Sequence, residues 1–337
     1  MKLSDYLLKF TESFLCSLIA DDIANRIGRL LPILGEASSG QYIIECEMHR
    51  PDKAGDFSIQ YTREEMPKLL STMEGGRMHA LRKESAVWAR ISEALKRWQE
   101  NALFSQINDF WLEFDYEALA KDPPLPCCFF DADSLPLINA IDGPLTILLG
   151  EKPSPGLEEN LSRCVSALEG VGLFQLGVML SREENPRPVR LFTNDLRAEQ
   201  VVPFLSKAGW GSREEYKKLE SFLAWAMECS DGLFIIDFGV HENALTSKLG
   251  ICFLPMPGLQ PMEKLLNVLV GHGLALQEKC DSLLKWMIGN EMKNGNKTLV
   301  NDISHFKFPF EGDILGSKVY LRQHPLQVSA IMQNNRW

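Results

Sequence analysis

Basic side chains recur at alternate positions of strand-like segments in the second half of the chain, and acidic side chains recur in the first half. The basic set is Arg190, Lys248, Lys307, Lys318 and Arg322, and the acidic set is Glu45, Glu47, Glu113 and Asp115. Alternate residues of a strand point to the same face of a sheet. If that face lines an enclosed space, the basic set is suited to hold a phosphate or a diphosphate. A carboxylate across the same space is suited to act as a general base.

Five strand-like hairpins supply these residues, and helical patterns fill the gaps between them. The paired segments are Tyr42–Met48 with Phe57–Thr62, Phe110–Asp115 with Cys127–Phe130, Gln175–Leu180 with Val189–Thr193, Leu233–Phe238 with Lys248–Leu254, and His305–Phe310 with Lys318–Arg322. A strand–strand–helix unit repeated five times predicts an α+β fold, with about ten antiparallel strands and all helices on one side. Such a sheet can close into a barrel that is wide enough to hold a ligand.

The two faces of each strand differ in composition, and this difference predicts which face lines the barrel. In Phe110–Asp115 one face is apolar, whereas the other holds Trp111, Glu113 and Asp115. Because the outer helices need an apolar surface, we expect the mixed face to line the lumen. The same reasoning turns Phe306, Phe308 and Phe310 outward, and it places these further residues inside: Ser58, Gln60, Gln175, Phe192, Asp237, Cys252, His305 and Tyr320. The alternative is a sheet whose polar face simply touches water.

The chain shows no linker and no change in composition, so we expect one domain over residues 1–337. An N-terminal helix is expected within 1–36, the repeated barrel within 40–325 and a C-terminal tail at 326–337. Pro123, Pro124 and Pro126 cannot donate hydrogen bonds to a strand ladder, so the fourth strand is expected to be short or irregular. An open ring at these prolines would favour a sheet that acts as a scaffold for partners.

Composition excludes several classes of partner. The net charge of -10 and the pI near 5.2 argue against general affinity for nucleic acid or anionic lipid. No apolar run is long enough to span a bilayer, and Met1–Ile19 has no signal-peptide pattern. Eight scattered cysteines without a CxxC pair predict free thiols in a reducing cytosol, so a cytoplasmic location is expected. The six histidines show no metal-ligand spacing, so no metal site is expected.

The last hairpin carries the motif that is closest to a known family. It reads Ile303-Ser304-His305-Phe306-Lys307-Phe308, followed by Ser317-Lys318-Val319-Tyr320-Leu321. This pattern resembles the S-H-x-K and K-x-Y ending of the ABBA-type prenyltransferases, also called PT-barrel enzymes. They include the cyanobactin peptide prenyltransferases and the fungal dimethylallyltryptophan synthase type. The family is built from repeated α-β-β-α units, which form a ten-stranded antiparallel barrel with helices outside and the reaction inside.

The resemblance implies a prenyltransferase that moves a dimethylallyl or longer allylic group from its diphosphate to an acceptor. The acceptor would be an aromatic small molecule or another nucleophile, such as a peptide side chain, as in natural product biosynthesis. The resemblance implies diphosphate contacts from Lys307 and Lys318, with assistance from Arg322, Arg190 and Lys248. It implies a carbocation shield and acceptor pocket made of Tyr320, Trp111, Phe192 and His305. The proton acceptor would be Glu113, Glu45 or Glu47.

No organic cofactor is expected, and magnesium is compatible with the site only as a counter-ion of the diphosphate. A second hypothesis stays open beside the enzyme. The same barrel could hold a ligand or a peptide without chemistry, and the small number of basic motifs favours that hypothesis.

Overall fold

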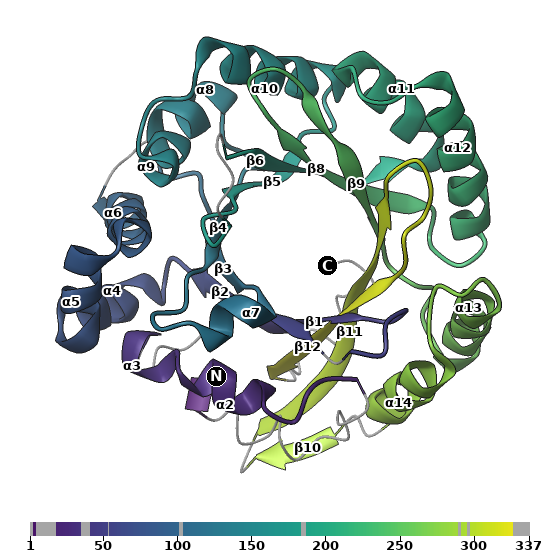
Figure 1. The fold of residues 1–337 in the computed structure, drawn as a ribbon, viewed down its shortest axis with the longest axis horizontal. Coiled ribbons are helices and arrows are strands. Elements are labelled where there is room, and N and C mark those ends of the chain that lie inside the picture. Colours follow the sequence, from purple (N-terminus) through teal and green to yellow (C-terminus); the bar gives the residue numbers. More distant parts are fainter. Residues whose placement is uncertain are drawn as a thin grey trace.

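A computed structural model describes residues 3–4, 18–34, 41–52, 54–100, 104–182, 187–288, 291–294 and 297–325 of the chain. Within these residues, ten strands pair in the closed order β1-β2-β3-β4-β5-β6-β8-β9-β11-β12, and β12 returns to β1 (Figure 1). All pairings around this ring are antiparallel. The predicted α+β fold, a closed antiparallel barrel of about ten strands, is therefore confirmed. The fold is that of the PT barrel.

The strands of the ring correspond to the five predicted hairpins. Their bounds are β1 Tyr42–Glu47, β2 Gly55–Thr62, β3 Asp109–Phe114, β4 Cys127–Asp131, β5 Leu173–Val178, β6 Val189–Thr193, β8 Leu233–Val240, β9 Leu245–Phe253, β11 Lys297–Phe310 and β12 Lys318–Pro325. Two further strands lie outside the ring. They are β7 Leu196–Arg197, which pairs with β8, and β10 Glu291–Asn294, which pairs with β11.

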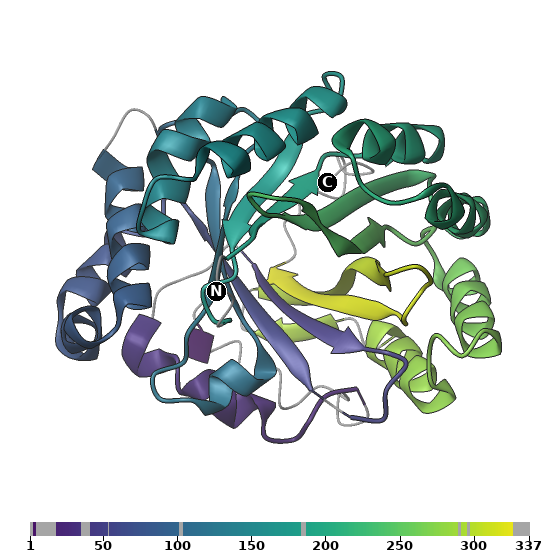
Figure 2. The same cartoon turned by 45° about the horizontal axis from the view of Figure 1, so that its top comes forward.

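Helices surround the ring of strands, as Figure 1 and the tilted view in Figure 2 show. Their bounds are α2 Ile23–Gly28, α3 Leu31–Leu34, α4 Met66–Glu74, α5 Gly76–Glu84, α6 Ala86–Glu100, α7 Tyr116–Ala120, α8 Leu137–Ala140, α9 Thr146–Leu149, α10 Pro155–Ala167, α11 Ala198–Ala208, α12 Arg213–Met227, α13 Leu259–Gly271 and α14 Gln277–Ile288, with a π-helical turn at Ile141–Leu145. In the described part of the chain, no helix is long and apolar enough to cross a membrane.

Local sequence explains where two of the outer helices begin. Ser154 precedes α10, and its hydroxyl accepts a hydrogen bond from the Leu157 N–H at 3.3 Å. Before α12, the Ser212 N–H donates to the Glu215 carboxylate at 2.8 Å, and the Glu215 N–H donates back to the Ser212 hydroxyl at 3.4 Å. Both caps satisfy backbone donors that a helix leaves unpaired at its first turn.

The outward face of β11 anchors the last hairpin against the helices. Phe306, Phe308 and Phe310 are buried in the main core, as predicted. The Phe308 ring centroid lies 5.2 Å from that of Phe222 on α12. Burying a side chain of this size contributes about 1.5–3 kcal/mol. Because alternate residues face opposite sides, this packing fixes His305 and Lys307 toward the lumen.

The prolines before β4 do not open the ring. β4 is short, yet it pairs with β3 on one edge and with β5 on the other. The segment before β4 is hydrogen-bonded to the outer helix α6, because the Trp88 indole N–H donates to the Pro124 carbonyl at 3.0 Å. The prediction of a short strand is confirmed. The open-sheet alternative, which needed a break at this point, is not supported.

The ends of the chain are covered only in part. Within the predicted N-terminal segment, the described residues form α2 and α3, and most of the helix expected before residue 18 lies outside the described residues. The tail at 326–337 also lies outside them. The seven described cysteines are free and buried, as predicted, and Cys16 falls outside the described residues.

Candidate active site

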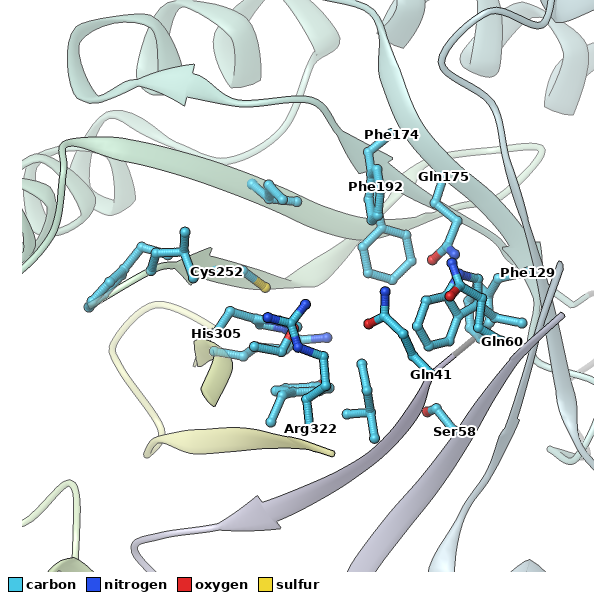
Figure 3. Close-up of a pocket in the computed structure, with 18 of the residues that line it drawn as sticks. Gln41, Ser58, Gln60, Phe129, Phe174, Gln175, Phe192, Cys252, His305 and Arg322 are labelled. Atoms are coloured by element: carbon cyan, nitrogen blue, oxygen red, sulfur yellow. The ribbon is translucent and has the colours of Figure 1, made fainter. Parts of the chain in front are cut away.

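The ring of strands encloses a cavity of about 510 Å³ toward one end of the barrel. Its lining comes from the beginnings of β1, β3, β5 and β8 and from the ends of β2, β6 and β9, which meet at one end because the strands are antiparallel. The interior parts of β4, β11 and β12 complete the lining. Seven of the residues that the sequence assigns to the site line this cavity, namely Trp111, Glu113, Phe192, His305, Lys307, Tyr320 and Arg322. Figure 3 shows side chains from opposite sides of the ring converging on this space.

The other five predicted site residues do not line the cavity. They are Glu45, Glu47, Arg190, Lys248 and Lys318. Glu47 ends β1, while Arg190 and Lys318 stand near the beginnings of β6 and β12, so these residues lie toward the opposite end of the barrel. Lys248 is exposed to solvent. The predicted residues are thus divided between the cavity wall and a charged layer next to it.

An apolar cluster inside the barrel forms part of the cavity wall. Cys127, Phe129 and Met179 are buried together, apart from the main core, and Trp111 and Phe192 pack against them. The rings of Phe129 and Phe192 meet edge to face, with their centroids 5.7 Å apart. These aromatic faces can shield a developing positive charge, because the face of an aromatic ring carries negative electrostatic potential.

Three strands bring two cations onto one buried carboxylate. Asp237 on β8 has no exposed surface, and its carboxylate pairs with Arg190 on β6 and with the Lys307 ammonium on β11 at 2.7 Å. The Lys307 ammonium also lies 5.7 Å from the centroid of the Phe192 ring. Burial lowers the pKa of Lys307, and the nearby charge of Arg190 lowers it as well.

A second ion-pair cluster lies beside the first. Glu45 on β1 pairs with Lys318 and accepts a hydrogen bond from the Tyr320 hydroxyl, and Lys318 also lies 3.5 Å from Glu47. Burial alone would raise the pKa of Glu45. The charges of Lys318 and Lys307, with the hydrogen bonds from Lys318 and Tyr320, outweigh burial and lower that pKa to about 2. Glu45 is therefore held as a carboxylate and is a weak base.

His305 and Tyr320 form an aromatic pair in the cavity wall. Their rings stack with centroids 4.0 Å apart and an interplanar angle of 19°. Burial and the charge of Lys307 lower the pKa of His305 to about 3, so the imidazole is neutral near pH 7. The pair therefore presents an uncharged aromatic surface to the cavity.

Glu113 differs from Glu45 because it lacks a close cationic partner among the described residues. Burial raises the pKa of Glu113 to about 7, and the charge of Glu45 contributes in the same direction. Between the candidate bases Glu45 and Glu113, it is thus Glu113 whose pKa is raised toward neutrality. A carboxylate with a pKa near 7 is suited to accept a proton at neutral pH.

The predicted separation of charge across the barrel is wrong. The sequence predicted cations on one side and carboxylates on the other, but the two alternate around the ring. Arg190 and Lys307 share Asp237, and Arg322 pairs with Asp302. Both of these carboxylates come from the same half of the chain as the cations. Alternation assigns a side chain to a face, but pairing across the ring also depends on the stagger between strands.

Several residues at the cavity were not named as site residues from the sequence. The amide side chains of Gln41, Gln60 and Gln175 line the cavity (Figure 3). Asp109 also lines the cavity, and burial raises its pKa to about 6. Alternation had placed Gln60 and Gln175 inside, but uncharged amides carry no motif that marks them as a site. No group of three or more His, Cys, Asp or Glu side chains is arranged to hold a metal ion in the described part of the chain.

Comparison with known proteins finds a likeness to solved structures but none at the level of sequence. No protein-family model and no curated protein matches the sequence. Among solved structures, the crystal structure of AnaPT from Neosartorya fischeri is similar, with 12% sequence identity and a TM-score of 0.49. The alignment covers 91% of this chain and 87% of that one. A likeness of this size says nothing about substrate or activity. The PT-barrel fold is evident from the topology of the chain itself.

Proposed function

We propose that this chain is a prenyltransferase, in which the barrel transfers an allylic prenyl group from its diphosphate to a nucleophilic acceptor. One observation carries the proposal. A single enclosed cavity is lined by a cation, Lys307, by the aromatic groups Trp111, Phe192 and Tyr320, and by Glu113, whose pKa is about 7. Ionisation of an allylic diphosphate needs the first two features, and loss of the acceptor's proton needs the third.

In the proposed reaction, Lys307 binds the diphosphate from the cavity wall. Arg190, which shares Asp237 with Lys307 in the adjoining charged layer, helps to stabilise the charge that grows on the diphosphate as the C–O bond breaks. Lys318, Arg322 and Lys248 add positive charge around this position. The allylic cation forms beside the aromatic wall, which excludes water. The acceptor's nucleophilic atom then forms the new bond to carbon, and its proton passes to the Glu113 carboxylate.

The three candidate bases are not equivalent. Glu45 has its pKa held at about 2 by its cationic neighbours, whereas the pKa of Glu113 is about 7. We therefore assign the base to Glu113 and a structural role to Glu45, which orients Lys318 and Tyr320. Magnesium enters the proposal only as a counter-ion that arrives with the diphosphate.

A second function, ligand binding without chemistry, is favoured by the pairing of the cations. Arg190 and Lys307 already share Asp237, Lys318 pairs with Glu45, and Arg322 pairs with Asp302. Cations that are neutralised in this way stabilise a leaving diphosphate less than free cations would.

Two measurements separate these functions. The first is titration calorimetry with a non-hydrolysable prenyl thiodiphosphate, and the second is release of pyrophosphate from prenyl diphosphates in the presence of a panel of acceptors. Binding together with acceptor-dependent release supports the transferase. Binding without release, across aromatic and peptide acceptors, would support the binding barrel instead.

A further inference from the structure

Asp237 is the buried carboxylate on which the lumen faces of three strands converge. It stands on β8, and it receives Arg190 from β6 and Lys307 from β11, at 2.7 Å for the lysine. Among the described residues, neither cation makes an ion pair with any other carboxylate. Asp237 and its two cations therefore carry one net positive charge between them, which faces the more distant carboxylates of Glu45 and Glu113.

The local sequence of β9 makes room for this contact. Gly250 is the direct neighbour of Asp237 in the β8–β9 register. A Cβ atom at position 250 would overlap both the Asp237 carboxylate and the Lys307 Cε atom. Lys307 therefore reaches Asp237 across β9 because that strand has no side chain at this position. The arrangement depends on glycine for space, since Gly250 does not have a positive φ.

We propose that Asp237 is the positioning residue of the diphosphate site, where it holds the Lys307 ammonium and the Arg190 guanidinium side by side and charged. The inference rests on the proposed function, because it takes these two cations as the diphosphate anchors. An ammonium and a guanidinium carry more N–H donors than one carboxylate can accept. Because they share Asp237, the Lys307 ammonium and the Arg190 guanidinium are held at a fixed separation from each other. Each keeps N–H donors that can bind a second anion.

Loss of the Asp237 charge should make Lys307 sensitive to pH. Burial and Arg190 already lower the pKa of Lys307. The other groups that interact with it are Glu45 on β1, Glu113 on β3, Lys318 on β12 and the neutral His305 on its own strand, together with Cys252 and Lys248 on β9. Without the adjacent carboxylate, Lys307 releases its proton at lower pH. Anion affinity should then fall as pH rises.

The test is titration calorimetry with inorganic pyrophosphate at pH 6 and pH 9, on the parent and on Asp237→Asn. The ratio of variant to parent Kd at each pH removes the effect of pyrophosphate's own protonation. We expect Asp237→Asn to bind as tightly as the parent or more tightly at pH 6. At pH 9 we expect it to bind about tenfold more weakly, because Lys307, without the adjacent carboxylate, releases its proton at lower pH and a neutral amine holds the anion less tightly.

Gly250→Ala tests the geometry with all charges retained, and it should weaken pyrophosphate binding about tenfold at both pH values. Asp22→Asn is the matched control. This substitution removes a carboxylate that lies 2.6 Å from Arg26 on the outer helix α2. The variant protein should bind pyrophosphate like the parent. If Asp237→Asn does not fold, Gly250→Ala decides the question alone.

The outcomes are distinguishable. In one outcome the parent binds pyrophosphate, and the ratio of the Asp237→Asn Kd to the parent Kd is the same at pH 6 and pH 9. This result overturns the role of Asp237 but leaves the proposed function standing. Parent-like binding by Gly250→Ala overturns it as well. A parent that binds neither pyrophosphate nor a prenyl thiodiphosphate removes the proposed function, and this inference with it.

Discussion

Glu113→Gln should remove the pH dependence of turnover near neutrality, because it keeps the shape of the side chain and removes its basicity. With a pKa of about 7, roughly a tenth of Glu113 is ionised at pH 6 and roughly nine tenths at pH 8. If the carboxylate accepts the proton, the parent's kcat should rise about tenfold between these values. The variant should be slower by about 10²-fold or more, with a flat profile and with nearly unchanged affinity for prenyl diphosphate.

The neighbouring carboxylate gives this prediction a second readout. The charge of Glu45 helps to raise the pKa of Glu113, so Glu45→Gln should move the parent's inflection to lower pH while activity at pH 8 is largely kept. Glu47→Gln is the parallel control. Initial rates over pH 5.5–9, read by mass spectrometry of the product, measure all three variants. If Glu113→Gln keeps the parent's rate and inflection, Glu113 is not the base. If all three variants do so, water or the leaving diphosphate takes the proton.

Glu113→Gln should also change the free energy of unfolding, and the raised pKa of Glu113 determines the direction of that change. The pKa of Glu113 is raised from 4.5 to about 7 in the folded protein, so the unfolded chain ionises first as pH rises. Stability is therefore lost between about pH 4.5 and pH 7, by at most about 3 kcal/mol. Glu113→Gln should unfold at a higher urea concentration than the parent at pH 8, and at a similar concentration at pH 4.5. A Glu113→Gln variant that is less stable than the parent at pH 8 would contradict the conclusion that the half-buried Glu113 carboxylate has no close cationic partner among the described residues.

Three further outcomes are expected. Lys307→Met should weaken diphosphate binding by about 1–3 kcal/mol in calorimetry, and an unchanged affinity would remove Lys307 from the site. The variant should also lower Tm, because Asp237 loses one of its two partners. Gly177→Ala should lower Tm by several degrees in a thermal melt, because its methyl group would overlap the Phe129 ring. An unchanged Tm would show that the apolar cluster around Phe129 can rearrange to accommodate the methyl group. Chelation with EDTA should leave the fold intact by circular dichroism, because the described residues hold no cluster of metal ligands, and an unfolding transition on chelation would reveal a structural metal.

The fold could be predicted because its signals are local. Alternation along β11 separates Phe306 and Phe308 from His305 and Lys307, and strand geometry alone sends the two pairs to opposite faces. Repetition of the hairpins then predicts the ring. The phenylalanines did pack on the helices, and the histidine and the lysine do line the cavity.

The pairing of charges could not be predicted, because it depends on distances across the barrel. Asp302 shows why. Counting back by twos from His305 puts Asp302 on the outer face, but the β11–β12 register shifts between Ile303 and His305. One extra residue reverses the alternation, so Asp302 comes opposite Arg322 and pairs with it.

The difference in pKa between Glu45 and Glu113 also could not be predicted from the sequence. Both lie at alternate positions of early strands, and both were candidate bases. Lys318 and Tyr320 reach Glu45 from the last strand, whereas Glu113 has burial and like charges around it. Only the closed ring, which brings β12 next to β1, separates the pKa values of the two carboxylates.

The most direct test of the central claim is mass spectrometry of acceptors after incubation with the protein and a panel of prenyl diphosphates. The panel should pair dimethylallyl and longer diphosphates with aromatic small molecules and with peptides. The account predicts that an acceptor gains one prenyl group with release of pyrophosphate, and that Glu113→Gln reduces the product about 10²-fold. A parent protein that binds the prenyl thiodiphosphate but modifies no acceptor and releases no pyrophosphate would contradict it, and would identify the barrel as a binding protein.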